Sequence, residues 1–375
     1  DGGSNGAGPE GGVGGGRIAS ASFTNNGTIT VAANSFGAIA GNITMNASGN
    51  VSIAAGGELS LQGSTTYNGG TYTGPGTLTQ DTGAMVVAAN TTIGVATYDW
   101  DGGDVGGFST TTVNSGVTFT INSNVIEDDP SAYESTVTIN SGTLAVNTLA
   151  AWPLAGTLNL VDTGPGDSVL AGQPVQLVTG GQINVTSGAQ LPAGISVNNG
   201  VLNTISSVAV VSGPYTSAAS GALTKTGAAQ VNFNGPQSHG PGSSLTILGG
   251  TVVMNSDAGA GGQNLTVTHG GTSFFMGTTQ HLARLILNPG STATLAGAGN
   301  DNVLDTNVLT IAGGAVPTAT LNITDENMIV DYSGVSPFAT IRAQIIAGYN
   351  GGAWNGLGIR SSNAAFNLSF GVGYA

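Results

Sequence analysis

The chain has 375 residues, of which 39% are hydrophobic, 6% are charged and 64 are glycine. Its formal net charge of −14 comes from 19 acidic and 5 basic residues, too few cations to build the basic face that nucleic acid requires or to bind an anionic lipid surface. No apolar run is long enough to span a membrane as a helix, and the lack of cysteine excludes disulfides and thiolate metal sites.

Residues 1–22 form the first predicted region, a Gly-rich leader followed by a candidate inter-subunit segment. The leader has no periodicity, so it is either a disordered tail or a tether. As a tether, it would let the segment from Arg17 to Phe23 pair with a neighbouring subunit. Asp1-Gly-Gly-Ser also fits a mature terminus left after a signal peptide is removed, and this agrees with export to the outside of the cell.

Residues 23–324 repeat one phrase, an alternating apolar and polar strand, a Gly-containing turn and a second alternating strand. Alternation at period two sends Ile, Leu and Val to one face and Thr, Ser and Asn to the other, while Gly or Asn provides the sharp corners. Recurrence at roughly 20 to 25 residues is typical of a solenoid whose stacked coils share one core. Copies of the phrase occupy 51–61, 137–147, 183–191, 245–255, 265–272, 285–295 and 309–315.

The fold class predicted from this pattern is all-β, a parallel β-solenoid of about 12 to 15 coils in which Asn and Thr side chains form ladders between coils. The alternative is a pair of antiparallel β-sandwich domains, which also contain short strands at regular spacing. The last region, 325–375, differs in character. Residues 336–349 have apolar positions at helical spacing, with Ser-Pro at the start and Gly near the end, which predicts one short helix that caps the stack.

Two segments resemble known bacterial surface proteins. Leu223-Thr224-Lys225-Thr226-Gly227, followed by Gly-Gly-Thr-Val at 249–252, resembles the autotransporter-associated β-strand repeat. Residues 329–375 look like the end of the repeat region in large secreted proteins of planctomycetes and related environmental bacteria. The resemblance implies a right-handed parallel β-helix that is exported and lies at the cell surface, and it carries over no catalytic residue.

One acidic cluster has the composition of a calcium loop. Asp99, Asp101 and Asp104 are separated by glycines, and Ca²⁺ prefers several oxygen ligands on a flexible Gly-bearing loop. The three residues are therefore the candidate metal site, and a solvated acidic turn is the alternative. The segment 297–305 resembles a single Gly/Asp nonapeptide of calcium-binding β-rolls, but such sites form between consecutive copies. Ca²⁺ is the one cofactor that we consider.

Signals for catalysis are weak. Hydrolases and lyases on β-helices use groups of carboxylates, often with Arg or Lys nearby, whereas the acids here are mostly isolated and the four Arg lie far apart. His239, His269 and His281 have no nucleophile elbow or metal spacing around them, so structural or surface roles are expected.

These observations predict a non-enzymatic, extracellular structural protein of a bacterial cell surface. We expect it to be a subunit of a fibre that assembles head to tail, because a solenoid is already a one-dimensional stack. The predicted partner is therefore a second copy of the chain. Nine Asn-x-Ser/Thr triplets would also allow glycans to take part. A monomeric adhesin or stalk and a carbohydrate-active β-helix enzyme are the alternatives.

Overall fold

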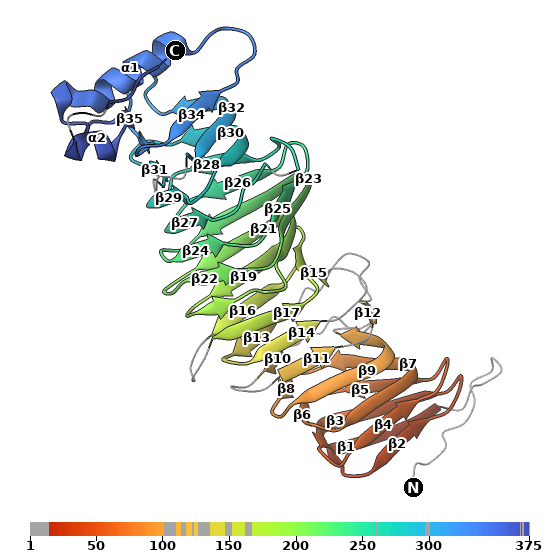
Figure 1. Ribbon diagram of the computed structural model, residues 1–375. Coiled ribbons are helices and arrows are strands. Elements are labelled where there is room, and N and C mark those ends of the chain that lie inside the picture. Colours follow the sequence, from red (N-terminus) through yellow and green to blue (C-terminus); the bar gives the residue numbers. More distant parts are fainter. Residues whose placement is uncertain are drawn as a thin grey trace. The chain divides into compact units, whose positions relative to one another are not determined.

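The computed structural model describes residues 15–100, 110–113, 118–121, 124–126, 136–146, 152–161, 167–259, 261–296, 301–367, 369 and 371–374. The chain divides into two compact units, 1–193 and 194–375, which are described one at a time (Figure 1). Every strand pairing of described register is parallel, and the chain is a β-solenoid of about 12 turns with a short C-terminal helix. The predicted solenoid is confirmed, and the antiparallel sandwich alternative is wrong.

Unit 1 consists of short strands joined by tight corners. They are β1 (Gly15–Asn25), β2 (Thr28–Val31), β3 (Phe36–Asn46), β4 (Asn50–Ile53), β5 (Glu58–Gln62), β6 (Thr65–Asn68), β7 (Thr71–Thr82), β8 (Met85–Val87), β9 (Thr91–Trp100), β10 (Thr110–Val113), β11 (Thr118–Ile121), β12 (Asn124–Ile126), β13 (Thr136–Asn140), β14 (Thr143–Val146), β15 (Trp152–Leu154), β16 (Thr157–Val161), β17 (Ser168–Gly172), β18 (Val175–Leu177), β19 (Gly181–Val185) and β20 (Ala189–Gln190).

The strands of unit 1 stack in three rows, and long strands such as β3 bend at a corner and contribute to two of them. One row runs from the first half of β1 through β3, β5, β7 and β9 to β12. A second runs from the end of β1 through β3, β6, β8, β10, β13 and β16 to β19. The third runs from β2 through β4, β7, β9, β11, β14 and β17 to β20.

Alternation along each strand builds the core, as the repeated phrase predicted. In the second row, Val137 pairs with Leu158 and Leu158 with Ile183, and all three side chains are fully buried. Burying one such aliphatic side chain stabilises a fold by about 1.5–3 kcal/mol, and each turn adds several to the common core. The stacked interior therefore accounts for the stability of a chain that has no disulfide.

Asparagine ladders run along the outside of the stack and confirm part of the predicted ladder pattern. Asn46 donates its amide to Asn26 over 2.7 Å, and Asn68 donates to Asn46 over 3.1 Å. These partners lie 20 and 22 positions apart in the chain, within the period read from the repeats. Asn46 thus donates to one neighbour and accepts from the other, so successive turns are tied together outside the core.

Unit 2 continues the same strand pattern and ends with the helices. Its elements are β21 (Ile195–Thr204), β22 (Ala209–Val211), β23 (Tyr215–Thr226), β24 (Gln230–Phe233), β25 (Gln237–His239), β26 (Ser244–Ile247), β27 (Thr251–Met254), β28 (Thr266–His269), β29 (Ser273–Met276), β30 (Gln280–Leu287), β31 (Thr292–Leu295), β32 (Val303–Ile311), β33 (Thr320–Asn322), β34 (Asn327–Val330), α1 (Phe338–Tyr349), the 3₁₀ helix η1 (Asn350–Gly352), β35 (Gly358–Arg360) and α2 (Ser362–Phe366).

The three rows of unit 2 end at different strands. The longest contains β22, β24, β27, β29, β31, β33 and β35. A second contains β21, β23, β26, β28, β30 and the end of β32. In the third, the first half of β30 pairs with β32, and β32 pairs with β34.

The start of β1 lies inside the predicted leader. Residues 15–19 and 22–25 of β1 pair with β3, so Gly15 and Gly16 do not prevent strand formation. The physical reason is that Ile18 and Phe23 continue the inward columns of Ile39 and Ile43, with which they pair. β1 therefore takes in the last two residues of the Gly-rich stretch, Gly15 and Gly16, together with the candidate inter-subunit segment.

Helix α1 lies at the C-terminal end of unit 2, where Figure 1 draws it beside β35. Gln344, Ile345 and Gly348 are its buried residues, and the Gln344 amide donates to the carbonyl of Gly314 over 3.1 Å. The helix starts two residues after the predicted Ser-Pro signal. The region 325–375 also contributes β34 and β35 to the strand rows. No helix in the described part of the chain is long and apolar enough to cross a membrane.

Candidate functional site

The candidate calcium cluster falls at the edge of what the structure describes. Asp99 lies near the end of β9 with its side chain buried, whereas Asp101 and Asp104 are outside the described residues. Within the described ranges, no three His, Cys, Asp or Glu side chains gather as metal ligands. The calcium site at Asp99, Asp101 and Asp104 stays a prediction.

In the second calcium-like segment, residues 297–300 are also outside the described ranges, but Asn302 can be placed. Its side chain is buried, donates to the carbonyl of Ala296 over 3.3 Å and accepts from the amide of Thr279 over 3.1 Å. These bonds tie Asn302 to the main chain of its own loop and of the preceding turn.

The three histidines differ in setting. His239 is buried, with Nδ1 2.8 Å from the Ser217 hydroxyl and Nε2 3.2 Å from the side-chain oxygen Oε1 of Gln237. Burial lowers the pKa of His239 to about 4. His269 is also buried, with Nε2 3.0 Å from the carbonyl of Thr292, and burial lowers its pKa. His281 lies at the surface, where its Nδ1 is 2.6 Å from a carboxylate oxygen of Asp257.

The contact between Ser217 and His239 has the atom types of a nucleophile and its base, but its position does not suit catalysis. Ser217 and His239 are 8% and 3% exposed, and the His239 ring packs edge-on against Tyr215 at a centroid distance of 4.7 Å. A nucleophile must be within reach of its substrate. We read the pair as a hydrogen-bonded element of the core.

Lys225 is a buried cation that the sequence analysis missed as a structural feature. It lies in β23 with no solvent exposure, and its ammonium donates to the carbonyls of Thr226, Gly227 and Gly249 over 2.7, 3.0 and 2.9 Å. Burial lowers its pKa to about 8. Lys225 and Gly249 are 24 positions apart, so this side chain joins corners of adjacent turns. The sequence does place Lys225 at an inward position of the alternating strand, two residues after Leu223, and this position could have indicated burial.

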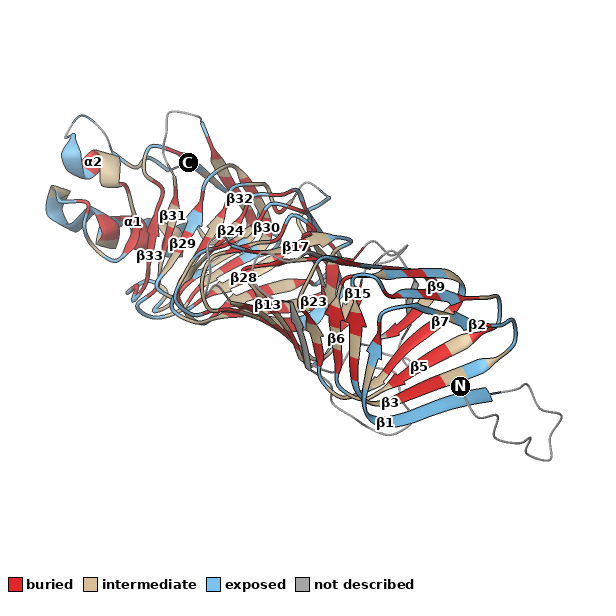
Figure 2. Ribbon diagram, turned by 90° about the horizontal axis from the view of Figure 1, so that it is seen from below, coloured by how far each residue is buried: buried red, intermediate tan, exposed pale blue. Residues whose placement is uncertain are grey.

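The first functional feature of unit 1 is the outer edge of β1, which we call the N-terminal edge. Among the described residues, β1 pairs with β3 alone, and positions 15 to 22 are exposed (Figure 2). Ile18 remains 39% exposed even though its column is buried one turn later at Ile39. An unpaired strand edge beside uncovered core is a template for another strand.

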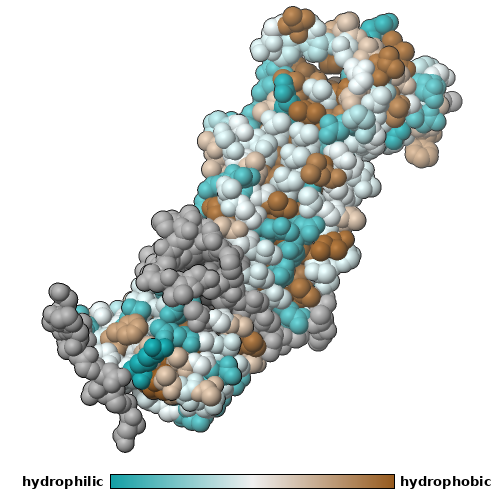
Figure 3. All heavy atoms as spheres, turned by 180° about the vertical axis from the view of Figure 1, so that it is seen from behind, coloured by the Kyte–Doolittle hydropathy of each residue, from teal (hydrophilic) through white to brown (hydrophobic). Residues whose placement is uncertain are grey.

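The second feature, in unit 2, is the outer edge of β34. This strand pairs with β32, and in the part of the chain that the structure describes no other strand and no main-chain hydrogen bond from 371–374 reaches it. Ile329, at the centre of β34, is 52% exposed. Figure 3 shows hydrophobic surface over this end of unit 2, where the exposed apolar side chains include Ile329, Tyr332, Val335, Phe338 and Tyr374.

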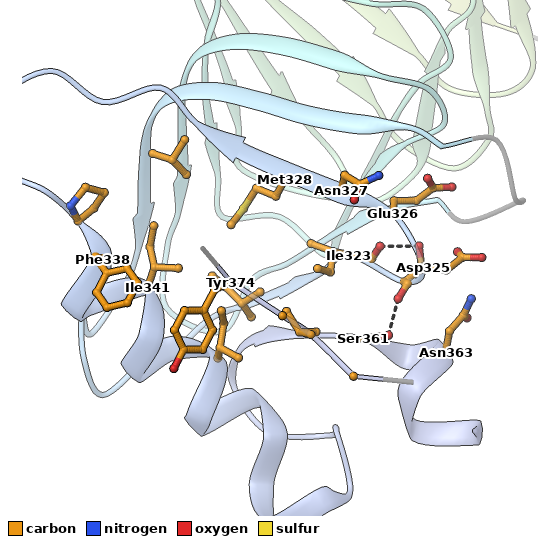
Figure 4. A pocket seen from close by; sticks show the side chains of 18 of the residues that line it. Ile323, Asp325, Glu326, Asn327, Met328, Phe338, Ile341, Ser361, Asn363 and Tyr374 are labelled. Atoms are coloured by element: carbon orange, nitrogen blue, oxygen red, sulfur yellow. Dashed lines mark hydrogen bonds between the residues drawn. The ribbon is translucent and has the colours of Figure 1, made fainter. Parts of the chain in front are cut away.

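Beside β34 lies a cavity of about 650 Å³, which we call the C-terminal cavity. Met328 and Ile323 line it from the strand side, and Ile341 and Tyr374 line it from α1 and the C-terminal tail (Figure 4). Asp325 and Glu326 stand at its polar margin. The cavity therefore combines an apolar wall with an acidic rim next to a free strand edge.

Tyr374 anchors the tail across this cavity. Its hydroxyl accepts a hydrogen bond from Nε of Arg342 over 2.9 Å, and its ring meets Phe338 edge-on at 5.5 Å. The aromatic character of this region was visible in the sequence. Its position beside the edge of β34 was not, because Tyr374 and β34 are more than 40 positions apart and meet only through the fold.

Comparison with known proteins identifies no relative of this chain. No family model, curated protein or solved structure matches the chain.

Proposed function

We propose that this chain is a non-enzymatic structural protein of a bacterial cell surface, a subunit that stacks head to tail into a fibre or filament. The observation that carries the proposal is the pair of open strand edges, β1 in unit 1 and β34 in unit 2, each beside incompletely covered apolar side chains. Such edges pair readily with other strands. Because the two edges differ, a contact between them is heterologous and can continue without closing.

The location at the cell surface rests on different support. The resemblance of 223–227 and 249–252 to the autotransporter-associated repeat, together with the lack of cysteine, agrees with an exported protein. The enzymatic alternative gains nothing from the Ser217 and His239 pair, since both residues are buried. The adhesin or stalk alternative predicts a monomer, so the state of assembly separates it from the filament.

The test is the state of the purified full chain in solution. Sedimentation velocity over a wide range of concentration should show mass increasing with concentration, and negative-stain electron microscopy should show unbranched filaments of uniform width. A chain that remains monomeric at every concentration and shows no filaments would contradict the proposal and favour the adhesin or stalk.

A further inference from the structure

We infer that the joint between copies is a parallel strand pairing in which β1 of one copy lies along the free edge of β34 of another, with Arg17 placed among the carboxylates that flank β34. This inference rests on the proposed function, since it specifies how the subunits join. It commits to one occupant for the edge of β34, a second copy of this chain.

The inward columns limit the register of this pairing. In unit 2, Leu304 and Thr306 are buried and pair with Met328 and Val330, which places these two β34 residues on the core side. In β1 the core-side residue is Ile18, because it pairs with buried Ile39. A one-residue slip would turn every side chain to the wrong face. Two registers keep the core side continuous, with Ile18 beside Met328 or beside Val330. We adopt the second, because it sets Arg17 beside Ile329, between Asp305 and Asp331.

The same register places Arg17 beside Ile329 on the outward face. Within its own copy, Ile329 pairs with Asp305, and Asp331 follows two positions later on the same face as Ile329. A strand spacing of about 4.8 Å and a two-residue step of about 6.8 Å put Arg17 and Asp331 roughly 8 Å apart at their Cα atoms, a diagonal that long side chains can bridge. One carboxylate oxygen of Asp305 is buried without a hydrogen-bond partner, so a guanidinium nearby would compensate it.

The charge distribution of the sequence favours this contact over others. Arg17 is the only Lys or Arg in residues 1–193. Residues 285–341 contain Asp301, Asp305, Asp325, Glu326 and Asp331 and no Lys, Arg or His. Arg342 follows, and its Nε donates to the Tyr374 hydroxyl on the α1 side of the cavity. Pairing β1 with β34 brings Arg17 close to the acidic residues around β34. Pairing two β34 edges would instead bring carboxylates of the two copies close together. Opposite charge selects the head-to-tail orientation, and like charge opposes the tail-to-tail one.

The apolar parts of the two ends also complement each other. Ile18 is partly exposed at one end, and the C-terminal cavity is lined by Ile323, Met328 and Ile341 beside the strand that Ile18 would join. An inward Ile18 next to Val330 would face this cavity and bury apolar surface that each free copy leaves accessible. Main-chain hydrogen bonds along β34 would supply the remaining contacts.

The experiment reverses the charges singly and together. Arg17→Glu and Asp331→Arg should each raise the critical concentration for filament formation by about tenfold or more, because each places like charges at the joint. The double variant Arg17→Glu/Asp331→Arg should assemble at close to the wild-type concentration. The control variants are Asp167→Arg in unit 1 and Arg284→Glu in unit 2, which make the same charge changes at exposed positions away from β1 and β34. Both should assemble as the wild type does.

The controls separate this inference from the proposed function. Circular dichroism confirms that every variant keeps its β-rich fold. The pairing of β1 with β34 is contradicted if the wild-type chain assembles but Arg17→Glu and Asp331→Arg have no effect, or if the double variant does not recover assembly. The proposed filament is not contradicted by either result. A wild-type chain that does not assemble contradicts both.

Discussion

Several buried polar side chains in unit 2 bond to the main chain of an adjacent turn. The Gln280 amide donates to the carbonyl of Ser256 over 2.9 Å, Lys225 reaches Gly249, and His269 contacts Thr292. The two partners in each contact are 23 or 24 positions apart, which is one turn of the solenoid. Such bonds are lost if one turn slips against the next, so these residues specify register as well as adding stability.

His239 makes the stability of the fold depend on pH. The ordinary histidine pKa is 6.5, whereas burial lowers that of His239 to about 4 in the folded chain. Between these values the unfolded chain binds a proton that the folded chain does not, so stability falls as pH falls. The expected loss from pH 6.5 to pH 4 is about 3 kcal/mol from this residue alone.

Urea denaturation at several pH values measures this effect. His239→Gln has no titrating group at this position, so its free energy of unfolding should fall less steeply between pH 6.5 and pH 4 than that of the wild-type chain. Parallel curves for the two proteins would show that His239 does not contribute.

Lys225 should stabilise the corners that it joins. Lys225→Met keeps the length and apolar stem of the side chain but leaves the carbonyls of Thr226, Gly227 and Gly249 without this donor. We expect a loss of about 1–3 kcal/mol in the free energy of unfolding, measured by chemical denaturation. Thr224→Met, at the half-exposed position one residue before, should change stability by less than about 0.5 kcal/mol. Equal effects of the two substitutions would argue against the role of the ammonium.

At the scale of the element, the corners depend on two separate properties of glycine. Gly227 and Gly290 have nearly the same φ, +77° and +78°, but a Cβ at Gly227 would lie 2.1 Å from the carbonyl oxygen of Thr204, while a Cβ at Gly290 would meet nothing within 4 Å. Gly290→Ala should therefore cost only the left-handed backbone conformation, about 1–2 kcal/mol. Gly227→Ala should cost more and lower the melting temperature further. Equal melting temperatures would show that the corner at Gly227 relaxes without cost.

The strands of the repeats could be predicted from the sequence because alternation at period two is a local signal. Segment 51–61 was predicted as strand, turn and strand, and it forms the end of β4, a corner and β5. The start of β1 was missed because Gly15 and Gly16 carry no alternation, and their pairing depends on β3 some 20 residues later. The free edge of β34 and the cavity beside it could not be predicted, since they depend on where each strand row ends in three dimensions.

At the scale of the whole molecule, a solenoid gains stability turn by turn, and its two terminal turns have a neighbour on one side only. Arg17 and Ile18 lie on the first described turn, and the acidic residues around β34 lie on one of the last. A joint between these ends would extend the same nearest-neighbour contacts into the next copy. Assembly and folding would then depend on one kind of interaction, the stacking of one turn on another.

This view makes a prediction for mixtures of subunits. Arg17→Glu copies have a normal acidic end, and Asp331→Arg copies have a normal basic edge, so neither variant joins well to itself. In an equimolar mixture, Arg17 of one variant can pair with Asp331 of the other, and the reversed pair is also complementary. We therefore expect filaments from the mixture at a protein concentration where each variant alone stays monomeric, as measured by sedimentation and electron microscopy. Alternation of the two copies should be visible when one carries a gold label, and a mixture that stays monomeric would show that the charges at 17 and 331 do not meet.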